Sequence, residues 1–129
     1  MEPRSQKMHS ILVIDDEESS CRLFRAILEK AGYTIYTAAN GLEGMKILKE
    51  HDPDLVITDI IMPVMEGVET IMKIRKEQPG KKIIAMTGHG RLGQVGLDIA
   101  DKLGVDMSFS KPFSKEKILQ MIEHVLGEK

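Results

Sequence analysis

The sequence predicts an α/β protein in which five parallel strands alternate with five helices. Short apolar runs, such as residues 11–14 and 55–57, are typical of strands buried on both faces of a sheet. Segments with apolar residues at three- and four-residue spacings follow these runs, as amphipathic helices require. Strict alternation of the two element types implies a parallel sheet with helices on both faces. A chain of 129 residues is long enough for one such domain.

The predicted elements follow one another with short turns between them. The expected strands span residues 11–14, 33–38, 55–59, 82–87 and 104–109. Gly32 is expected to end the first helix, Pro79-Gly80 to end the third, and Ser114 to cap the last. A glycine-rich segment, residues 88–96, precedes a helix over 97–103, and its start should be frayed because each helical glycine costs about 1 kcal/mol against alanine. The methionines expected in the core are Met45, Met72, Met86 and Met121.

Composition argues against several functional classes. The formal net charge is −2 and no basic run occurs, so direct binding of nucleic acid is not expected. The longest apolar runs are far too short to cross a bilayer, and the first ten residues lack the apolar core of a signal peptide, so no membrane contact is expected. The single cysteine, Cys21, cannot form an internal disulfide, which favours a cytoplasmic location. We expect residues 1–9 to be a flexible tail and residues 10–129 to be one domain.

Polar side chains are predicted to converge on one edge of the sheet. The carboxyl ends of parallel strands share an edge, which is where open α/β sheets bind ligands. The residues at or just beyond these ends are Asp15, Asp16, Asp59, Thr87 and Lys111. Three crowded carboxylates repel one another unless a cation joins them, and hard oxygen ligands suit Mg²⁺, with Mn²⁺ as an alternative.

Such an ion would permit a phosphate to approach Asp59, whose carboxylate is a competent phosphoryl acceptor. The Lys111 ammonium and the Thr87 hydroxyl could hold the other phosphoryl oxygens. The alternative for Asp59 is a loop aspartate that forms an Asx turn or caps the next helix.

These residues, in this order and spacing, resemble the receiver domain of bacterial response regulators, which act in two-component signalling. The motifs that carry the resemblance are Asp15-Asp16-Glu17, Asp59 with Met62-Pro63 and Gly67 behind it, Thr87, and Lys111-Pro112-Phe113. The resemblance covers residue 10 to about residue 126. It implies a flavodoxin-like (βα)5 fold with strand order 2-1-3-4-5.

The resemblance also assigns roles to single residues. Asp59 would be the phosphoacceptor, while Thr87 and Lys111 would contact the phosphoryl group. The implied metal ligands are Asp15 (through water), Asp16, Asp59 and the backbone carbonyl of Ile61. The Lys111–Pro112 peptide bond would be cis, which is plausible because X-Pro bonds adopt this form at low cost.

The partners implied by the resemblance are a sensor histidine kinase or phosphotransfer protein and a downstream protein. The downstream protein would bind the face formed by the fourth helix, the fifth strand and the last helix. A stand-alone receiver, monomeric or weakly dimeric, would act in trans. It would catalyse only its own phosphorylation and slow self-dephosphorylation, because apolar Ile61 cannot orient the attacking water. His89, two residues beyond Thr87, could influence the same chemistry.

Other interpretations of the same residues were open. Haloacid-dehalogenase-like phosphatases also use a strand-end aspartate, but they need an acid two residues later, where this chain has Ile61. An inert module of receiver shape would not need the intact acidic set. Residues 88–93 fit G-x-G-x-x-G, with Asp106 as a candidate ribose ligand, but Asp106 begins its strand instead of ending it. Glu17 and Glu18 suit the first turn of a helix better than a metal site.

Ser108 departs from the family pattern. Most receivers carry tyrosine or phenylalanine three residues before the lysine, and alternation along a strand directs Phe109 to the opposite face. Either a bulge restores an aromatic residue there, or the protein switches without one. In the second case, the glycine-rich segment 88–96 would be the bistable element.

Overall fold

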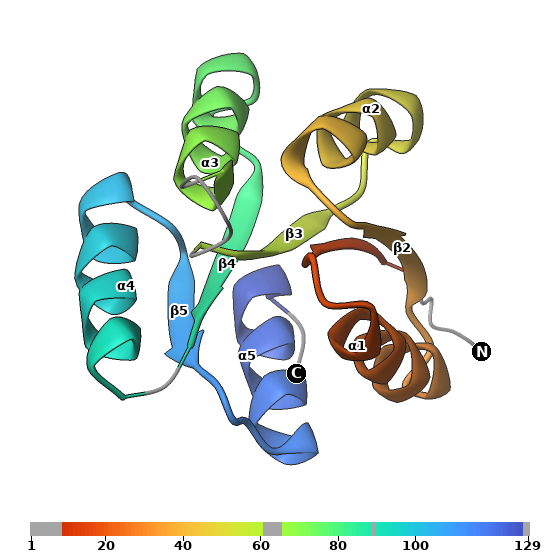
Figure 1. Ribbon diagram of the computed structural model, residues 1–129. Helices are drawn as coiled ribbons and strands as arrows, with labels where there is room; N and C mark the ends of the chain where they lie inside the picture. Colours follow the sequence, from red (N-terminus) through yellow and green to blue (C-terminus); the bar gives the residue numbers. More distant parts are fainter. Residues whose placement is uncertain (1–8, 61–65, 89, 128–129) are drawn as a thin grey trace.

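The computed structural model describes residues 9–60, 66–88 and 90–127, and these contain one parallel sheet and five helices (Figure 1). The strands are β1 (Ser10–Ile14), β2 (Thr34–Ala38), β3 (Leu55–Asp59), β4 (Lys82–Thr87) and β5 (Met107–Ser110). The helices are α1 (Glu18–Lys30), α2 (Gly41–His51), α3 (Glu66–Glu77), α4 (Gly90–Leu103) and α5 (Lys115–Leu126). The strand order β2-β1-β3-β4-β5 confirms the predicted flavodoxin-like fold.

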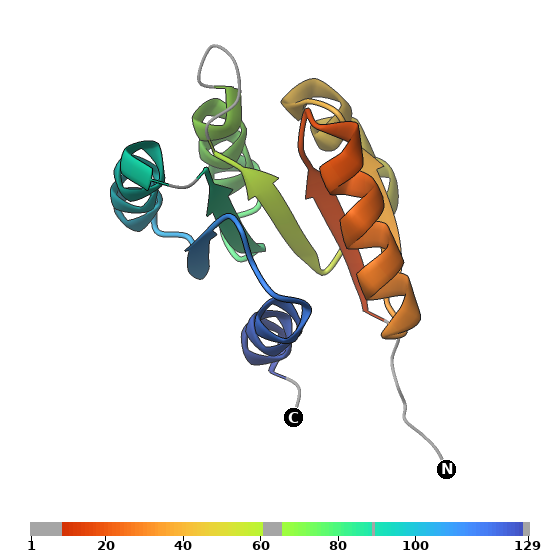
Figure 2. The same ribbon diagram turned by 60° about the horizontal axis from the view of Figure 1, so that its bottom comes forward.

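Two apolar cores lie on opposite faces of the sheet. Figures 1 and 2 show from two directions the helices that cover these faces. Side chains alternate along β1, so that Ile11 and Val13 join the core under α1 and α5, while Leu12 and Ile14 join the core under α2, α3 and α4. Every residue of β3 is buried, as expected for a central strand covered on both faces. No helix in the described parts of the chain has the length and apolar character needed to cross a membrane.

The residues at the helix ends have the capping roles that the sequence predicted for Gly32 and Ser114. Gly32 has a φ of 102° directly after the C-cap of α1, and Ser114 accepts a hydrogen bond from the N–H of Lys117 at 3.1 Å. Asn40 accepts from the N–H of Glu43, whose carboxylate in turn accepts from the N–H of Ala39, both at 2.9 Å. This pair resembles a capping box at the start of α2, except that Glu43 accepts from the residue before the N-cap.

The fourth helix begins earlier than predicted. It starts at Gly90 instead of residue 97, so most of the glycine-rich segment is helical, while fraying of this helix start stays a prediction. Gly93 and Gly96 are buried against the sheet, and a Cβ at Gly93 would overlap the carbonyl oxygen of Gly88. These glycines let the helix approach the end of β4 closely, and this packing outweighs their low helix propensity.

Two smaller predictions were also wrong. β5 begins at Met107 instead of residue 104, because Gly104, with a φ of 74°, still belongs to the end of α4. Met72, expected in the core, is 57% exposed. It lies about 100° around α3 from Ile71, which is buried together with Thr70 and Ile74.

Candidate functional site

Three aspartates lie together at the carboxyl edge of the sheet, which we define by the strand ends Ile14, Asp59 and Thr87. Asp59 is the last residue of β3, while Asp15 and Asp16 follow the neighbouring strand β1. One carboxylate oxygen from each aspartate lies within 4.8 Å of the other two. Asp15 and Asp59 are only 1% and 6% exposed, whereas Asp16 faces solvent. The predicted convergence of these carboxylates is therefore confirmed.

Lys111 supplies the positive charge at this edge. Its Nζ donates hydrogen bonds to Asp15 Oδ2 at 3.0 Å and to Asp59 Oδ2 at 3.2 Å, and lies 3.5 Å from Glu17 Oε1. Burial acts to lower the pKa of Lys111, but the hydrogen bonds and charges of the two aspartates outweigh burial and raise it. The side chain is therefore a firm cation at neutral pH, and its peptide bond to Pro112 is cis, as the resemblance implied.

The start of α1 holds Asp15 in place. Its Oδ1 accepts from the N–H of Glu17 at 3.0 Å, and its own N–H donates to the carbonyl of Ala38 at 3.1 Å. Glu17 is the N-cap of α1 and Glu18 its first residue, as their charge predicted. The thiol of Cys21 donates to the Asp15 carbonyl at 3.4 Å, and burial together with the Asp15 charge raises the pKa of Cys21.

Thr87 ends β4 and is completely buried. Its hydroxyl lies 3.1 Å from the carbonyl oxygen of Gly88 and 3.2 Å from that of Gly93, and can donate its proton to either. The side chain is thus at the predicted edge, with its hydroxyl engaged by the start of α4. The sequence predicted the place of Thr87 but not this contact, although glycines three residues apart in an amphipathic helix were a usable signal for close packing.

The register of β5 shows whether a bulge places an aromatic side chain where Ser108 stands in the sequence. β5 pairs with β4 in continuous register, with Ser108 opposite Ala85 and Phe109 opposite Met86, so residues 107–110 contain no bulge. Phe109 points to the core under α1 and α5. Its ring packs edge-on against the ring of Phe113, with 5.4 Å between the ring centroids. The α4 side of β5 therefore carries serine at this position.

Some predicted positions fall outside the described residues. They are Ile61, Met62, Pro63 and His89. The metal-binding carbonyl of Ile61 and an influence of His89 on phosphoryl chemistry stay predictions. Gly67 lies within the described residues. A Cβ on it would lie 2.7 Å from the Cα of Ile60, so the start of α3 packs directly on the backbone beyond Asp59.

The dinucleotide interpretation does not fit the structure. Asp106, the candidate ribose ligand, lies at the opposite edge of the sheet from the glycine-rich segment. Its Oδ2 accepts from the N–H of Ile83 at 2.7 Å, and its own N–H donates to the Ile83 carbonyl at 2.9 Å. These bonds anchor the start of β5 to β4.

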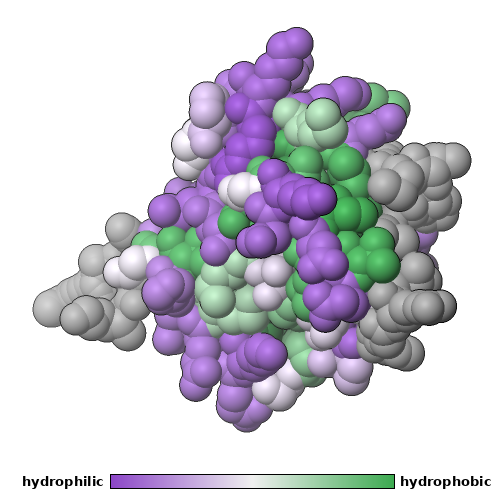
Figure 3. Space-filling view, turned by 90° about the vertical axis from the view of Figure 1, so that its left-hand side faces the viewer, coloured by the Kyte–Doolittle hydropathy of each residue, from purple (hydrophilic) through white to green (hydrophobic). Residues whose placement is uncertain are grey.

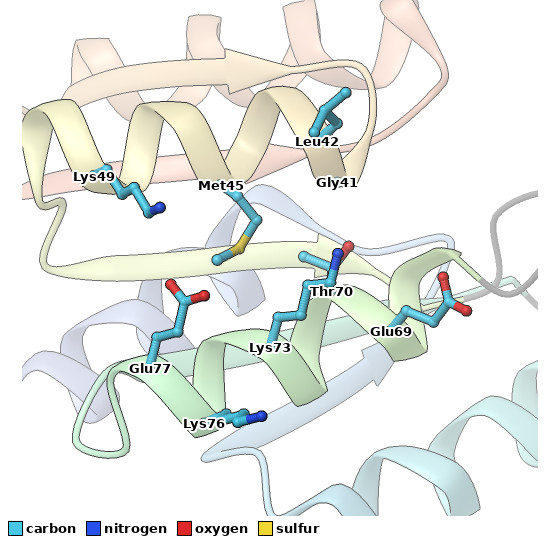
Figure 4. A pocket seen from close by; sticks show the side chains of 9 residues that line it. All are labelled: Gly41, Leu42, Met45, Lys49, Glu69, Thr70, Lys73, Lys76 and Glu77. Atoms are coloured by element: carbon cyan, nitrogen blue, oxygen red, sulfur yellow. The ribbon is translucent and has the colours of Figure 1, made fainter.

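A groove of about 510 Å³ between α2 and α3 is separate from the acidic edge (Figure 4). It is lined by Gly41, Leu42, Met45, Lys49, Glu69, Thr70, Lys73, Lys76 and Glu77. None of the predicted site residues is among them. The candidate site is therefore identified by its clustered charged side chains, and it does not coincide with this groove.

Comparisons with known proteins agree with this geometry. Residues 11–123 match the response regulator receiver domain family. The chain is 37% identical to the chemotaxis protein CheY of Halobacterium salinarum, covering 90% of this chain and 95% of that protein. It is 31% identical to sporulation initiation phosphotransferase F of Bacillus subtilis, with 90% and 92% covered. It is 34% identical to the transcriptional regulatory protein GlrR of Escherichia coli, of which it spans only 28%.

A solved structure gives the same result. The CheY-like receiver domain protein of Methanospirillum hungatei superposes with a TM-score of 0.84 at 30% identity, covering 94% of this chain and 95% of that one. Sequence, topology and the acidic edge thus point to the same assignment. The chain belongs to the response regulator receiver domain family of two-component systems.

Proposed function

We propose that Asp59 accepts a phosphoryl group from a phosphohistidine on a sensor histidine kinase or phosphotransfer protein. The observation that carries the proposal is the cluster of three carboxylates at the carboxyl edge, two of which, Asp15 and Asp59, accept hydrogen bonds from the ammonium of Lys111. In the transfer, a carboxylate oxygen of Asp59 forms the new P–O bond while the P–N bond of the donor breaks, and the electron pair stays on the imidazole nitrogen. The product is an aspartyl phosphate.

The same donor set fits Mg²⁺, with Mn²⁺ as a second choice. Three carboxylates within 4.8 Å offer hard oxygen ligands, and exposed Asp16 leaves one side open to water. When bound, the ion would neutralise charge on the phosphoryl oxygens. Asp16 would ligate it directly, Asp15 through water, and the carbonyl of Ile61 would be a further ligand.

Lys111 and Thr87 are assigned to the phosphoryl oxygens. The ammonium of Lys111 is already 3.2 Å from Asp59 Oδ2, so a group attached to this carboxylate would come within its reach. Thr87 ends the strand beside β3, and its hydroxyl could turn from α4 to the new anion. With apolar Ile61 two residues after Asp59, the chain lacks the acid that a phosphatase uses there, so we assign it slow self-dephosphorylation.

We assign the downstream partner to the face formed by α4, β5 and α5. Figure 3 looks at the α4 side of the molecule and shows apolar surface among hydrophilic residues. Val95 on α4 is 47% exposed, and Met107 on β5 and Leu126 on α5 are only partly buried. The proposal further includes a domain over residues 10–129, a cytoplasmic location, and a monomer or weak homodimer.

Mass spectrometry after incubation with acetyl phosphate and Mg²⁺ tests the acceptor. We expect a gain of one phosphate mass that is labile to base, suppressed by chelation and abolished by Asp59→Asn. Asp54→Asn is the matched control, because Asp54 stands at the other end of β3 and accepts from the N–H of Ser10 at 2.8 Å. A stable adduct on serine, threonine or histidine, or an adduct that survives in Asp59→Asn, would refute the assignment.

A further inference from the structure

Helix α4 rests directly on the side chain of Thr87. A Cβ added to Gly96 would overlap the Thr87 methyl group and lie 2.7 Å from the Thr87 Cβ and 3.3 Å from Ile60 Cγ2. The position of a Cβ is set by the backbone, so no rotation of the Thr87 side chain could relieve this contact. Glycine at position 96 is therefore needed for the observed distance between α4 and β4.

The end of β4 is fixed from both sides. The N–H of Ile60 donates to the carbonyl of Met86 at 2.9 Å, and the N–H of Lys111 donates to the carbonyl of Thr87 at 2.8 Å. The strand therefore cannot retreat from the helix. A larger residue at position 96 would have to move α4.

A hydrogen bond complements this steric contact. The Thr87 hydroxyl is 3.2 Å from the carbonyl oxygen of Gly93, one turn before Gly96 on the same helix. Gly93 is itself buried, and a Cβ on it would lie 3.5 Å from the Cβ of Ser110. The start of α4 thus sits close to both β4 and β5, and its carbonyl holds the hydroxyl that the phosphoryl group would need.

We propose that Gly96 is a positioning residue for Thr87. By allowing α4 to lie against β4, it keeps the Thr87 hydroxyl bonded to the helix, and this bond opposes binding of a phosphoryl group at Asp59. The inference rests on the proposed function, which assigns Thr87 to a phosphoryl oxygen. The new element is Gly96, which sets the position of the Thr87 hydroxyl before phosphorylation.

The inference predicts that Gly96→Ala improves binding of a phosphoryl mimic. The alanine methyl moves α4 away from β4 and lengthens the hydroxyl–Gly93 contact. The hydroxyl then keeps only its 3.1 Å contact with the carbonyl of Gly88, and it has one acceptor fewer to give up when a phosphoryl oxygen is offered. We expect half-saturation with beryllium trifluoride at about three- to tenfold lower concentration, the range of one hydroxyl hydrogen bond.

The test is a two-by-two set of 129-residue chains: wild type, Gly96→Ala, Thr87→Val and the double variant. Binding of beryllium trifluoride with Mg²⁺ is followed by ¹⁹F NMR, and folding is checked by circular dichroism. Valine keeps the shape of threonine but removes the hydroxyl. The higher helix propensity of alanine acts equally in the wild-type and Thr87→Val backgrounds, so it cannot explain a gain that appears only with threonine. Gly80→Ala is the matched glycine control, since a Cβ there meets nothing within 4 Å.

The expected result is a gain in Gly96→Ala that disappears in the Thr87→Val background, with Gly80→Ala equal to wild type. A gain that persists without the hydroxyl, or no gain, overturns the inference. Wild-type protein that neither binds the mimic nor gains phosphate refutes the proposed function instead. If Gly96→Ala does not fold, hydrogen exchange on Thr87→Val decides: lost protection in the first half of α4 supports the inference, and unchanged protection overturns it.

Discussion

The two edges of the sheet differ in how their negative charges are balanced by cations. At the amino edge, defined by Ser10, Leu55 and Lys82, Arg75 and Lys81 each pair with an aspartate. Arg75 lies 3.4 Å from Asp106, and Lys81 lies 2.8 Å from Asp52. At the carboxyl edge, Asp15, Asp16 and Asp59 lie together, and the ammonium of Lys111 pairs with Asp15 and Asp59.

The cations at the amino edge also bind backbone. Arg75 donates to the carbonyls of Pro79, Lys81 and Gly104, and Lys81 donates to the carbonyl of Pro53. These bonds join α3, the loop before β3 and the start of β5. The amino edge is therefore built for stability, whereas the carboxyl edge retains excess negative charge that a cation can relieve.

Removing the cation at the centre of the amino edge should give the largest loss of stability. Arg75→Ala deletes the hydrogen bonds to three carbonyls and leaves Asp106 without its cation. We expect the free energy of unfolding in urea to fall by about 2–3 kcal/mol. The stabilisation by Mg²⁺ should be unchanged, because the proposed metal site lies at the other edge.

Arg25→Ala is the control for Arg75→Ala. Arg25 pairs with Glu29 at 2.8 Å on the exposed surface of α1, so its loss should cost less than about 0.5 kcal/mol. Equal effects of the two substitutions would show that the amino edge has no special role in stability.

Removing Lys111 should have a smaller effect that the metal partly reverses. Lys111→Met leaves three carboxylates without their ammonium, and we expect a loss of about 1–2 kcal/mol without metal, less than for a fully buried pair because the side chain is 20% exposed. Millimolar Mg²⁺ should stabilise this variant more than wild type, since the ion takes over the neutralisation. Thermal unfolding with and without Mg²⁺ measures the difference, and a smaller response to Mg²⁺ than in wild type would contradict the comparison.

The smallest effect is expected from the pH dependence at the amino edge. The hydrogen bond and charge of Lys81 lower the pKa of Asp52 below its usual 3.8. A lowered folded-state pKa contributes stability above the unfolded-state value, and this contribution disappears as the pH falls through the folded-state pKa. Asp52→Asn should therefore flatten the loss of stability below about pH 4.

Asparagine suits position 52 because Asp52 has a φ of 46°, a left-handed conformation that asparagine tolerates. Urea unfolding at a series of pH values from neutral to acidic measures the effect. The two proteins should converge in stability at the acid end, and curves that stay parallel would show that this pair does not titrate with folding.

The fold and most of the site could be predicted because topology places strand ends. Once the alternating pattern indicates a parallel sheet, Asp15, Asp59 and Lys111 must meet at one edge, although Lys111 is distant from both in the chain. Alternation alone predicted that Ser108 and Phe109 point to opposite faces of the sheet, and the continuous register of β5 agrees.

The sequence could not reveal whether a glycine loosens a helix or lets it pack. Gly93 and Gly96 lower helix propensity in isolation, but here they allow contacts with Gly88 and Thr87 that only the tertiary structure shows. Met72 was misplaced for a related reason. Adjacent apolar residues in a helix can both be buried, as Met121 and Ile122 are in α5, so only the packing shows that Ile71 is buried while Met72 is exposed.

Calorimetric titration with Mg²⁺ tests the central claim, that the excess charge at the carboxyl edge forms a metal site. We predict one binding site in wild-type protein and loss of measurable binding in Asp16→Asn, which should also be more stable than wild type without metal because a repelling charge is removed. Glu18→Gln is the matched control: Glu18 is an exposed acid that begins α1 nearby and pairs only loosely with Arg22 at 3.5 Å, so its titration should match wild type. Unchanged binding in Asp16→Asn would show that the ion binds elsewhere and would contradict the account.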